Sequence, residues 1–284
     1  SGAQPAQVGP PPLAGILTRL QGEWPLLQQT LDAVQAADPV LWRSDNARYI
    51  HGRSSRGGVP ICWPWFGPHP TDSTLCPHGF ARVMPWDLME SYTLDNGATR
   101  LILQIMHTPV AQRQLSYPYN LSLTIDIGST LKIALTTTNR GNQPFVIGEA
   151  FHTYFQVSDV GNIAITGLEG CEYADKVLNY DRHTQQGVIR FDQEFDRVYV
   201  NTKADCVIED AGLNRRIRIA KTGSNATVIW TPWREKAHGL GDMGLDENWR
   251  RMICVESANA MENIVMVSPN QSHVLAVEYS TESM

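Results

Sequence analysis

The chain has 284 residues, 42% of them hydrophobic and only 18% charged, which allows a large buried core and favours a sheet-rich globular protein over a helix-rich or disordered one. A formal net charge of −6, a pI of about 5.7 and the lack of a Lys/Arg run argue against nucleic acid and acidic membranes as main partners. Five widely spaced cysteines without a CxxC pair argue against a disulfide framework and a structural zinc site.

The N-terminal region predicts neither a secretory signal nor a membrane anchor. Residues 1–15 are rich in Pro and Gly and are expected to form an irregular lead-in, while 12–35 fit either a helix or strands with irregular spacing. No stretch of the chain approaches the ~18–20 apolar residues of a membrane span, and the basic-then-apolar layout of a signal peptide is missing. We therefore expect a cytoplasmic protein with reduced thiols.

Beyond this region, short apolar runs with period-two alternation are broken by Gly, Asn or Asp, a pattern typical of strands. In chain order, the expected strands are 99–108, 121–127, 131–139, 162–168, 196–202, 206–210, 215–221, 226–232, 251–257 and 273–279. Many strands at short spacing, with weak helical periodicity and no repeat or linker, predict an all-β sandwich or barrel with few short helices. The economical interpretation is one antiparallel domain over residues 1–284.

Two loop segments carry polar groups that a plain β-sandwich does not need. In "SSRGGVPICWPWFGPHP", Arg56 precedes a glycine pair that lets the backbone bend or approach another group closely. In "CPHGFARVMPW", Arg82 offers a planar fork of donors for a carboxylate or phosphate, and His78 can donate to a hydroxyl or an oxyanion. The alternatives are a solvated Arg56, a His78 that is only a loop histidine, and an Arg82 in a surface ion pair.

A histidine and two acids complete the set of candidates. In "GEAFHTYFQV", strand alternation places His152 and Tyr154 on one face, an aromatic and polar surface that suits a sugar, although a lone strand histidine can be purely structural. Glu256 follows the apolar run 252–255, where an unused carboxylate costs free energy and burial would raise its pKa. Asp196, next to Arg197, is either a site residue or one half of an ion pair.

The Trp- and Gly-rich segment 228–244 is interpreted either as a pocket wall or as core packing followed by a turn, without a chemical role for any one residue.

The order of five short motifs, "RGGVPICWPWFGP", "HGFAR", "FHTYF", "DRVY" and "VES", resembles that of the D-hexose-6-phosphate mutarotases, also called glucose-6-phosphate 1-epimerases. These form a branch of the aldose 1-epimerase (galactose mutarotase-like) superfamily. The resemblance extends from Val40 to near the C-terminus; before Val40 the paired strands usual in the family are not evident. It implies a large antiparallel β-supersandwich that binds the sugar in a groove on its concave face.

The resemblance also implies roles for the matched residues. His152 would be the general acid and Glu256 the general base of an isomerase that interconverts the α and β anomers of hexose 6-phosphates. The base removes the proton of the anomeric hydroxyl while the acid protonates the ring oxygen, and both transfers reverse after rotation of the open aldehyde. We expect His152 to be protonated at rest, with Glu256 across the substrate from it. The other matched residues would bind the sugar (His78, Asp196) and the phosphate (Arg56, Arg82).

This chemistry needs no metal, nucleotide or redox cofactor, and the expected partner is a small sugar phosphate. Two alternatives remain open: a non-catalytic carbohydrate-binding protein on the same scaffold, or a glycoside hydrolase that uses Asp196 and Glu256 as its carboxylate pair and leaves His152 without a main role. The preferred hexose 6-phosphate, the use of free sugars and the oligomeric state also remain open, with glucose 6-phosphate and a monomer as the expectations.

Overall fold

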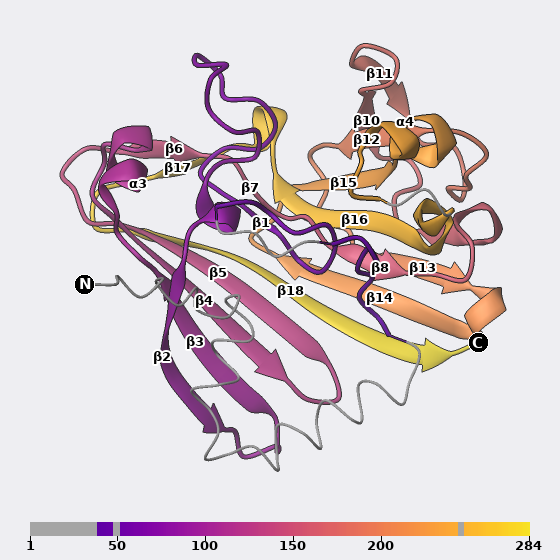
Figure 1. Cartoon of the computed structure of the whole chain (residues 1–284), viewed down its shortest axis with the longest axis horizontal. Coiled ribbons are helices and arrows are strands. Elements are labelled where there is room, and N and C mark those ends of the chain that lie inside the picture. The colour runs from indigo at the N-terminus through magenta and orange to yellow at the C-terminus, as the bar shows by residue number, and fades with distance from the viewer. Residues whose placement is uncertain (1–38, 48–51, 244–246) are drawn as a thin grey trace, which may run out of the picture.

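The structure, a computed structural model, describes residues 39–47, 52–243 and 247–284. Its described residues form two eight-stranded antiparallel sheets and one two-stranded sheet (Figure 1). We call the first large sheet the site sheet and the second the backing sheet. The mostly β architecture with few short helices confirms the predicted fold class. The predicted lead-in 1–15 and the segment 12–35 lie outside the described residues.

The site sheet is assembled from eight strands, with β8 continuing β7 along β16. In spatial order they are β1 (Ile61–Cys62), β7 (Glu149–Phe151), β8 (Tyr154–Gln156), β16 (Met252–Asn259), β15 (Ala226–Thr231), β12 (Phe195–Tyr199), β10 (Glu172–Asp175) and β11 (Asp181–Thr184).

The backing sheet contains the longest strands of the described chain. In spatial order they are β2 (Trp86–Thr93), β3 (Thr99–Ile105), β4 (Tyr119–Ile127), β5 (Leu131–Asn139), β18 (Ser272–Ser283), β14 (Arg215–Thr222), β13 (Cys206–Asp210) and β9 (Ala164–Thr166). The alternation noted in the sequence produces them directly, since Leu121, Leu123 and Leu135 are all buried on the face toward the core.

Short elements connect and flank the two sheets. They are α3 (Pro109–Gln114), α4 (Trp233–Gly239), the two-stranded pair β6 (Phe145–Ile147) and β17 (Val265–Val267), and the 3₁₀ turns η2 (Ala81–Val83), η3 (Val160–Asn162), η4 (Ala211–Leu213), η5 (Asn248–Arg251) and η6 (Met261–Asn263). No helix in the described part of the chain is long and apolar enough to cross a membrane.

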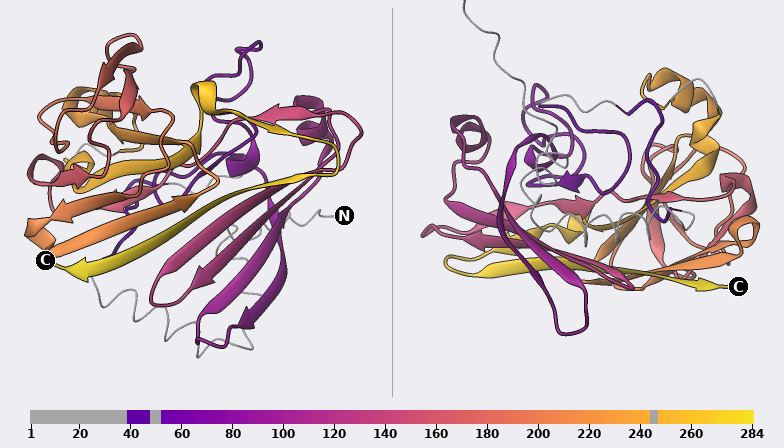
Figure 2. Two further views of the ribbon diagram at one scale, coloured as in Figure 1. Left: turned by 180° about the vertical axis from the view of Figure 1, so that it is seen from behind. Right: turned by 60° about the horizontal axis from the view of Figure 1, so that its bottom comes forward.

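Contacts with the core between the sheets show which side chains of the "GEAFHTYFQV" segment face inward and which face outward. The ring of Phe155 packs edge-on against Tyr279 of β18 at 5.1 Å, and the hydroxyls of Thr153 and Tyr279 are 2.6 Å apart. These side chains point toward the backing sheet, so alternation turns His152 and Tyr154 to the opposite, outer face of the site sheet. Figure 2 shows the two large sheets from two further directions, with the backing sheet as a layer beneath the site sheet.

A buried polar network ties β18 to the site sheet. Glu149 is fully buried, and its Oε1 lies 2.8 Å from Nε2 of His273 and accepts a hydrogen bond of 2.9 Å from the amide of Asn259. The hydrogen bond to Glu149 raises the pKa of His273. Because the folded pKa is raised, the stabilisation is complete below the ordinary histidine pKa and is lost as pH rises through the raised value.

We therefore expect Glu149→Gln to lower the free energy of unfolding by about 2 kcal/mol at pH 6 and by less at pH 8. Urea unfolding at the two pH values measures this difference. An equal loss at both values would contradict a charged His273–Glu149 pair, and the exposed His183→Ala serves as the histidine control.

Candidate active site

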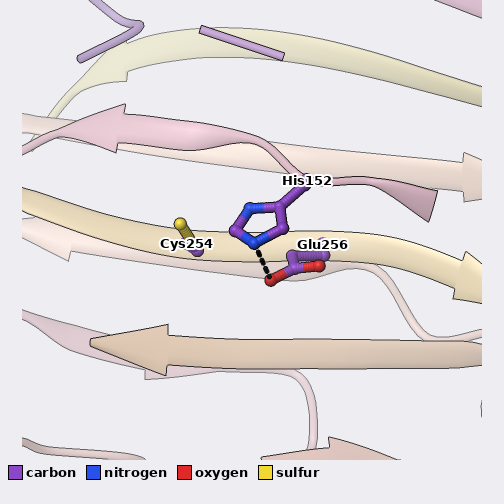
Figure 3. A group of neighbouring side chains, drawn as sticks. All are labelled: His152, Cys254 and Glu256. Carbon is purple, nitrogen blue, oxygen red and sulfur yellow. Dashed lines mark ion pairs between the residues drawn. The ribbon is translucent and has the colours of Figure 1, made fainter. Parts of the chain in front are cut away.

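The register of the site sheet brings His152 and Glu256 together. β7 and β8 pair with β16 in one continuous register, which places His152 directly opposite Glu256 on the outer face. Side chains at such paired positions are neighbours, and Nε2 of His152 lies 3.4 Å from Oε1 of Glu256 (Figure 3). The backbone N–H of His152 donates to the carbonyl of Pro60 at 3.0 Å, which fixes the segment from its other side. The contact therefore follows from strand pairing.

His152 lies in an aromatic setting. Its ring stacks on Tyr154 at 5.0 Å and 13°, and meets His78 and Trp230 edge-on at 5.7 and 5.9 Å. Its side chain keeps 12% of its surface exposed, against 2% for Glu256. The imidazole is thus not sealed in the core.

Burial corrects the expected protonation of this pair. Desolvation lowers the pKa of His152 well below its ordinary value, and the nearby charge of Arg82 acts in the same direction. Desolvation likewise raises the pKa of Glu256 well above its ordinary value, against the opposing effect of Lys176. His152 is therefore neutral at rest, not protonated as expected, and in this state it lies beside Glu256 instead of across a substrate-sized space from it.

Asp196 belongs to a row of outward-facing residues that crosses the site sheet next to the His152–Glu256 pair, two residues along each strand from it. Asp196 pairs with Trp230, which pairs with Cys254, which in turn pairs with Tyr154. At the end of the row Nζ of Lys176 lies 2.9 Å from Oδ2 of Asp196.

The Lys176–Asp196 contact leaves one carboxylate oxygen available. Oδ1 of Asp196 is buried and has no hydrogen-bond partner among the described residues. The backbone N–H of Lys176 donates to the Asp196 carbonyl at 2.8 Å, which anchors the lysine to the neighbouring strand. Desolvation raises the pKa of Asp196, and the Lys176 ammonium opposes this shift. The predicted ion pair of Asp196 thus exists, but its partner is Lys176 instead of Arg197, whose Nε bonds to Asp175 at 2.8 Å.

Arg56 is held on the Tyr154 side of the pair. Its Nε donates to Asp242 at 3.0 Å and its Nη1 donates to the Tyr154 hydroxyl at 2.9 Å, so it is not a freely solvated arginine. The glycine that follows it is required by a close approach: Gly57 has φ of +118°, and a Cβ there would lie 2.5 Å from Cα of Arg43. The glycine pair therefore serves backbone packing that positions Arg56.

His78 and Arg82 meet the site from the loop before β2. The N–H of Gly67 donates to Nδ1 of His78 at 3.4 Å, which leaves Nε2 as the nitrogen that carries a proton. Burial, aided by the charges of Arg82 and Lys176, lowers the pKa of His78 to about 3, so the ring is a neutral donor. Arg82, on η2, donates from Nη2 to the Pro77 carbonyl at 2.6 Å, while its buried Nε has no hydrogen-bond partner among the described residues.

The structure therefore gathers the sequence-predicted residues around one outer face, and it adds three that the sequence reasoning missed: Lys176, Asp242 and Cys254. Lys176 follows a short strand whose partner could not be read from the chain, and Asp242 lies in the Trp- and Gly-rich segment, of which Trp230 does form a wall beside His152. Cys254 occupies the same face of β16 as Glu256, two residues before it.

Comparison with known proteins identifies a family and several relatives of this chain. The sequence pattern of the family described as "Aldose 1-epimerase" matches residues 29–280. A Salmonella typhimurium protein named "Putative glucose-6-phosphate 1-epimerase" is 35% identical over 224 residues, which cover 78% of this chain and 74% of the relative. An Escherichia coli protein of the same name is 32% identical over 238 residues, covering 84% and 78%.

Solved structures share the fold. The crystal structure of a "putative mutarotase (YeaD)" from Salmonella typhimurium superposes with a TM-score of 0.81 at 32% identity, over 87% of this chain and 81% of that one. The Slr1438 protein from Synechocystis sp. PCC 6803 superposes with a TM-score of 0.73 at 22% identity, over 87% and 86%, and supports the fold alone.

Proposed function

The chain belongs to the aldose 1-epimerase family, and from this premise we propose that it interconverts the α and β anomers of hexose 6-phosphates, with glucose 6-phosphate as the first substrate to test. The observation that carries the proposal is the outward-facing His152–Glu256 pair, whose Nε2 and Oε1 are 3.4 Å apart. The relatives named "Putative glucose-6-phosphate 1-epimerase" support the choice of substrate.

The chemistry requires one proton to be shared by the pair. At rest burial favours a protonated Glu256 and a neutral His152. Before the sugar separates them, transfer of this proton from Glu256 to His152 across their direct contact yields the carboxylate base and the imidazolium acid. Glu256 then takes the proton of the anomeric hydroxyl while His152 protonates the ring oxygen, and the ring opens to the aldehyde. After rotation about C1–C2 both transfers reverse, so no proton is gained or lost in a full turnover.

The residues around the pair would orient the ring. The free Oδ1 of Asp196 can accept a hydrogen bond from a sugar hydroxyl, and the Nε2–H of His78 can donate one. Lys176 favours the ionised form of Asp196, because its ammonium opposes the effect of desolvation on this buried carboxylate.

We expect Lys176→Met to reduce kcat/KM for glucose 6-phosphate by about 10–100-fold, the range for losing one partner of a charged hydrogen bond. Lys176→Arg should retain most of the activity because the charge is kept. Anomer exchange measures both, and thermal unfolding checks that Lys176→Met stays folded. A full rate for a folded Lys176→Met would remove Lys176 from this role.

The phosphate would be bound by the arginines. Arg82 has a buried Nε without a partner among the described residues, and Arg56 keeps Nη2 free of the bonds made by Nε and Nη1. Charge-assisted and bidentate bonds from two guanidinium groups suit a phosphate dianion. That binding energy would also hold the ring against the acid–base pair.

Exchange between the two anomeric proton signals of glucose 6-phosphate, followed by NMR with and without the protein, tests the proposal. We expect a clear acceleration that scales with protein concentration, and no acceleration over buffer would refute it. Calorimetric sugar binding without exchange would indicate the carbohydrate-binding alternative, and release of reducing sugar from glycosides would indicate the hydrolase.

A further inference from the structure

Three different ligand atoms converge at the centre of the site. A ring nitrogen of His152, Sγ of Cys254 and a carboxylate oxygen of Glu256 all lie within 4.8 Å of one another. Cys254 and Glu256 are two residues apart on β16 and share its outer face, while His152 comes from the opposed segment between β7 and β8 (Figure 3). The thiol has no place in the acid–base chemistry proposed above.

The distance between the His152 nitrogen and the Glu256 oxygen is longer than that of a hydrogen bond. The 3.4 Å between Nε2 and Oε1 exceeds the ~2.7–3.2 Å typical of a hydrogen bond between nitrogen and oxygen. Two ligands bound to a tetrahedral zinc ion at about 2.0–2.1 Å lie about 3.3 Å apart. In addition, Oε2 of Glu256 is buried and has no hydrogen-bond partner among the described residues. The carboxylate therefore keeps unused lone pairs beside the imidazole and the thiol.

We propose that His152, Cys254 and Glu256 form a binding site for a soft or borderline divalent cation, represented by zinc, and that this cation inhibits the isomerase. Imidazole nitrogen, thiolate sulfur and carboxylate oxygen are each zinc ligands in proteins, and three protein ligands with a fourth position open is the arrangement of catalytic zinc sites. On binding, Cys254 and Glu256 each give a proton to solvent as the metal–sulfur and metal–oxygen bonds form, the neutral His152 ring loses none, and no electron transfer is involved. The cation occupies the lone pairs that the acid and base need, so substrate turnover and metal binding exclude each other.

The sulfur ligand sets the selectivity of this site. Thiolate favours zinc, cadmium and cobalt over the hard cations, whereas magnesium requires oxygen ligands in octahedral geometry. Magnesium that accompanies sugar phosphates in solution would therefore leave the site free. The inhibition rests on the proposed function, but the binding itself does not.

The experiment titrates the intact chain with Co²⁺ as a spectroscopic probe and with buffered free Zn²⁺ as an inhibitor. We expect a cobalt–thiolate charge-transfer band and the intense visible bands of a tetrahedral ion in the wild type. The control variant Cys76→Ala, which removes an exposed cysteine, should show the same bands. Cys254→Ala should lose the charge-transfer band. It should need at least about 100-fold more Zn²⁺ for half-inhibition, since second-shell changes alone cost 10–100-fold in affinity. Inhibition is expressed relative to the uninhibited rate of each variant, and a chelator should restore that rate.

Cys254→Ser, which nearly conserves volume, replaces the alanine variant if that one does not fold, and it should also lose the charge-transfer band. The proposal is overturned if the wild type shows no cobalt–thiolate band, if the band survives in Cys254→Ala, or if Mg²⁺ inhibits as strongly as Zn²⁺. If the wild type shows no isomerase activity at all, the cobalt titration still decides whether the site binds metal, so the two proposals fail separately.

Discussion

Replacing Glu256 with Gln should slow the anomer exchange of glucose 6-phosphate by about 10²–10⁴-fold, the usual contribution of a positioned acid–base group. The amide keeps the size of the side chain but cannot take the proton of the anomeric hydroxyl. His152→Gln should produce a loss of similar size, because ring opening needs both transfers. Line-shape or exchange NMR at saturating substrate measures the effect on kcat.

The double variant discriminates between a cooperating pair and two independent residues. When two groups act as a unit, removing both lowers the rate by far less than the product of the two separate fold-losses. The double variant should therefore be only slightly slower than either single variant. Glu262→Gln on η6, whose carboxylate bonds to Arg182 at 2.8 Å, is the control for a carboxylate outside the pair. Full rates in both single variants would remove the pair from the reaction.

Replacing Arg82 with Ala should raise the KM for glucose 6-phosphate by about 10–100-fold, as expected for the loss of one charged hydrogen-bonding group. The ratio of kcat/KM for the 6-phosphate to that for free glucose should fall by a similar factor, because the free sugar lacks the group that Arg82 would hold. Arg82→Lys should restore little, since a single ammonium does not reproduce the planar fork. Paired rate measurements on the two sugars give the ratio.

Arg56→Ala provides an instructive contrast to Arg82→Ala. It also removes the bonds to Asp242 and to Tyr154, on which the His152 ring is stacked, so its kcat should fall together with the rise in KM. Arg113→Ala on α3, far along the chain from both arginines, is the surface control. An unchanged sugar ratio in Arg82→Ala, or a wild type that uses both sugars equally well, would contradict the phosphate assignment.

Much of the fold could be predicted because each strand of the backing sheet packs only one of its faces against the core, which gives its sequence a clear alternation of apolar and polar residues. The alternation in 121–127 and 131–139 identified β4 and β5. β2 was missed, because a bulge between Leu88 and Glu90 interrupts its register, and so also the two-residue period on which the prediction depends. The short strands β1, β6, β10, β11 and β17 were missed because two to four residues are too few to show a period.

The composition of the site was more predictable than its arrangement. Residue types and motif order pointed to His152 and Glu256, but the partner of Asp196 depends on the pairing of β10 with β12, which no local pattern reveals. The protonation of His152 was predicted wrongly for a related reason. Burial is a property of the assembled sheet, and it outweighs the ordinary pKa of the imidazole.

The placement of His152 and Glu256 at paired positions makes the site intolerant of length changes in one particular strand. Deleting a single residue of β16 before Glu256 would turn every later outward side chain inward, sending the carboxylate toward the packed aromatic layer and Val255 to the surface. Chain-length variation among proteins that retain this reaction should therefore be confined to the connections between strands, and a deletion scan of β16 should abolish folding and turnover at the same positions.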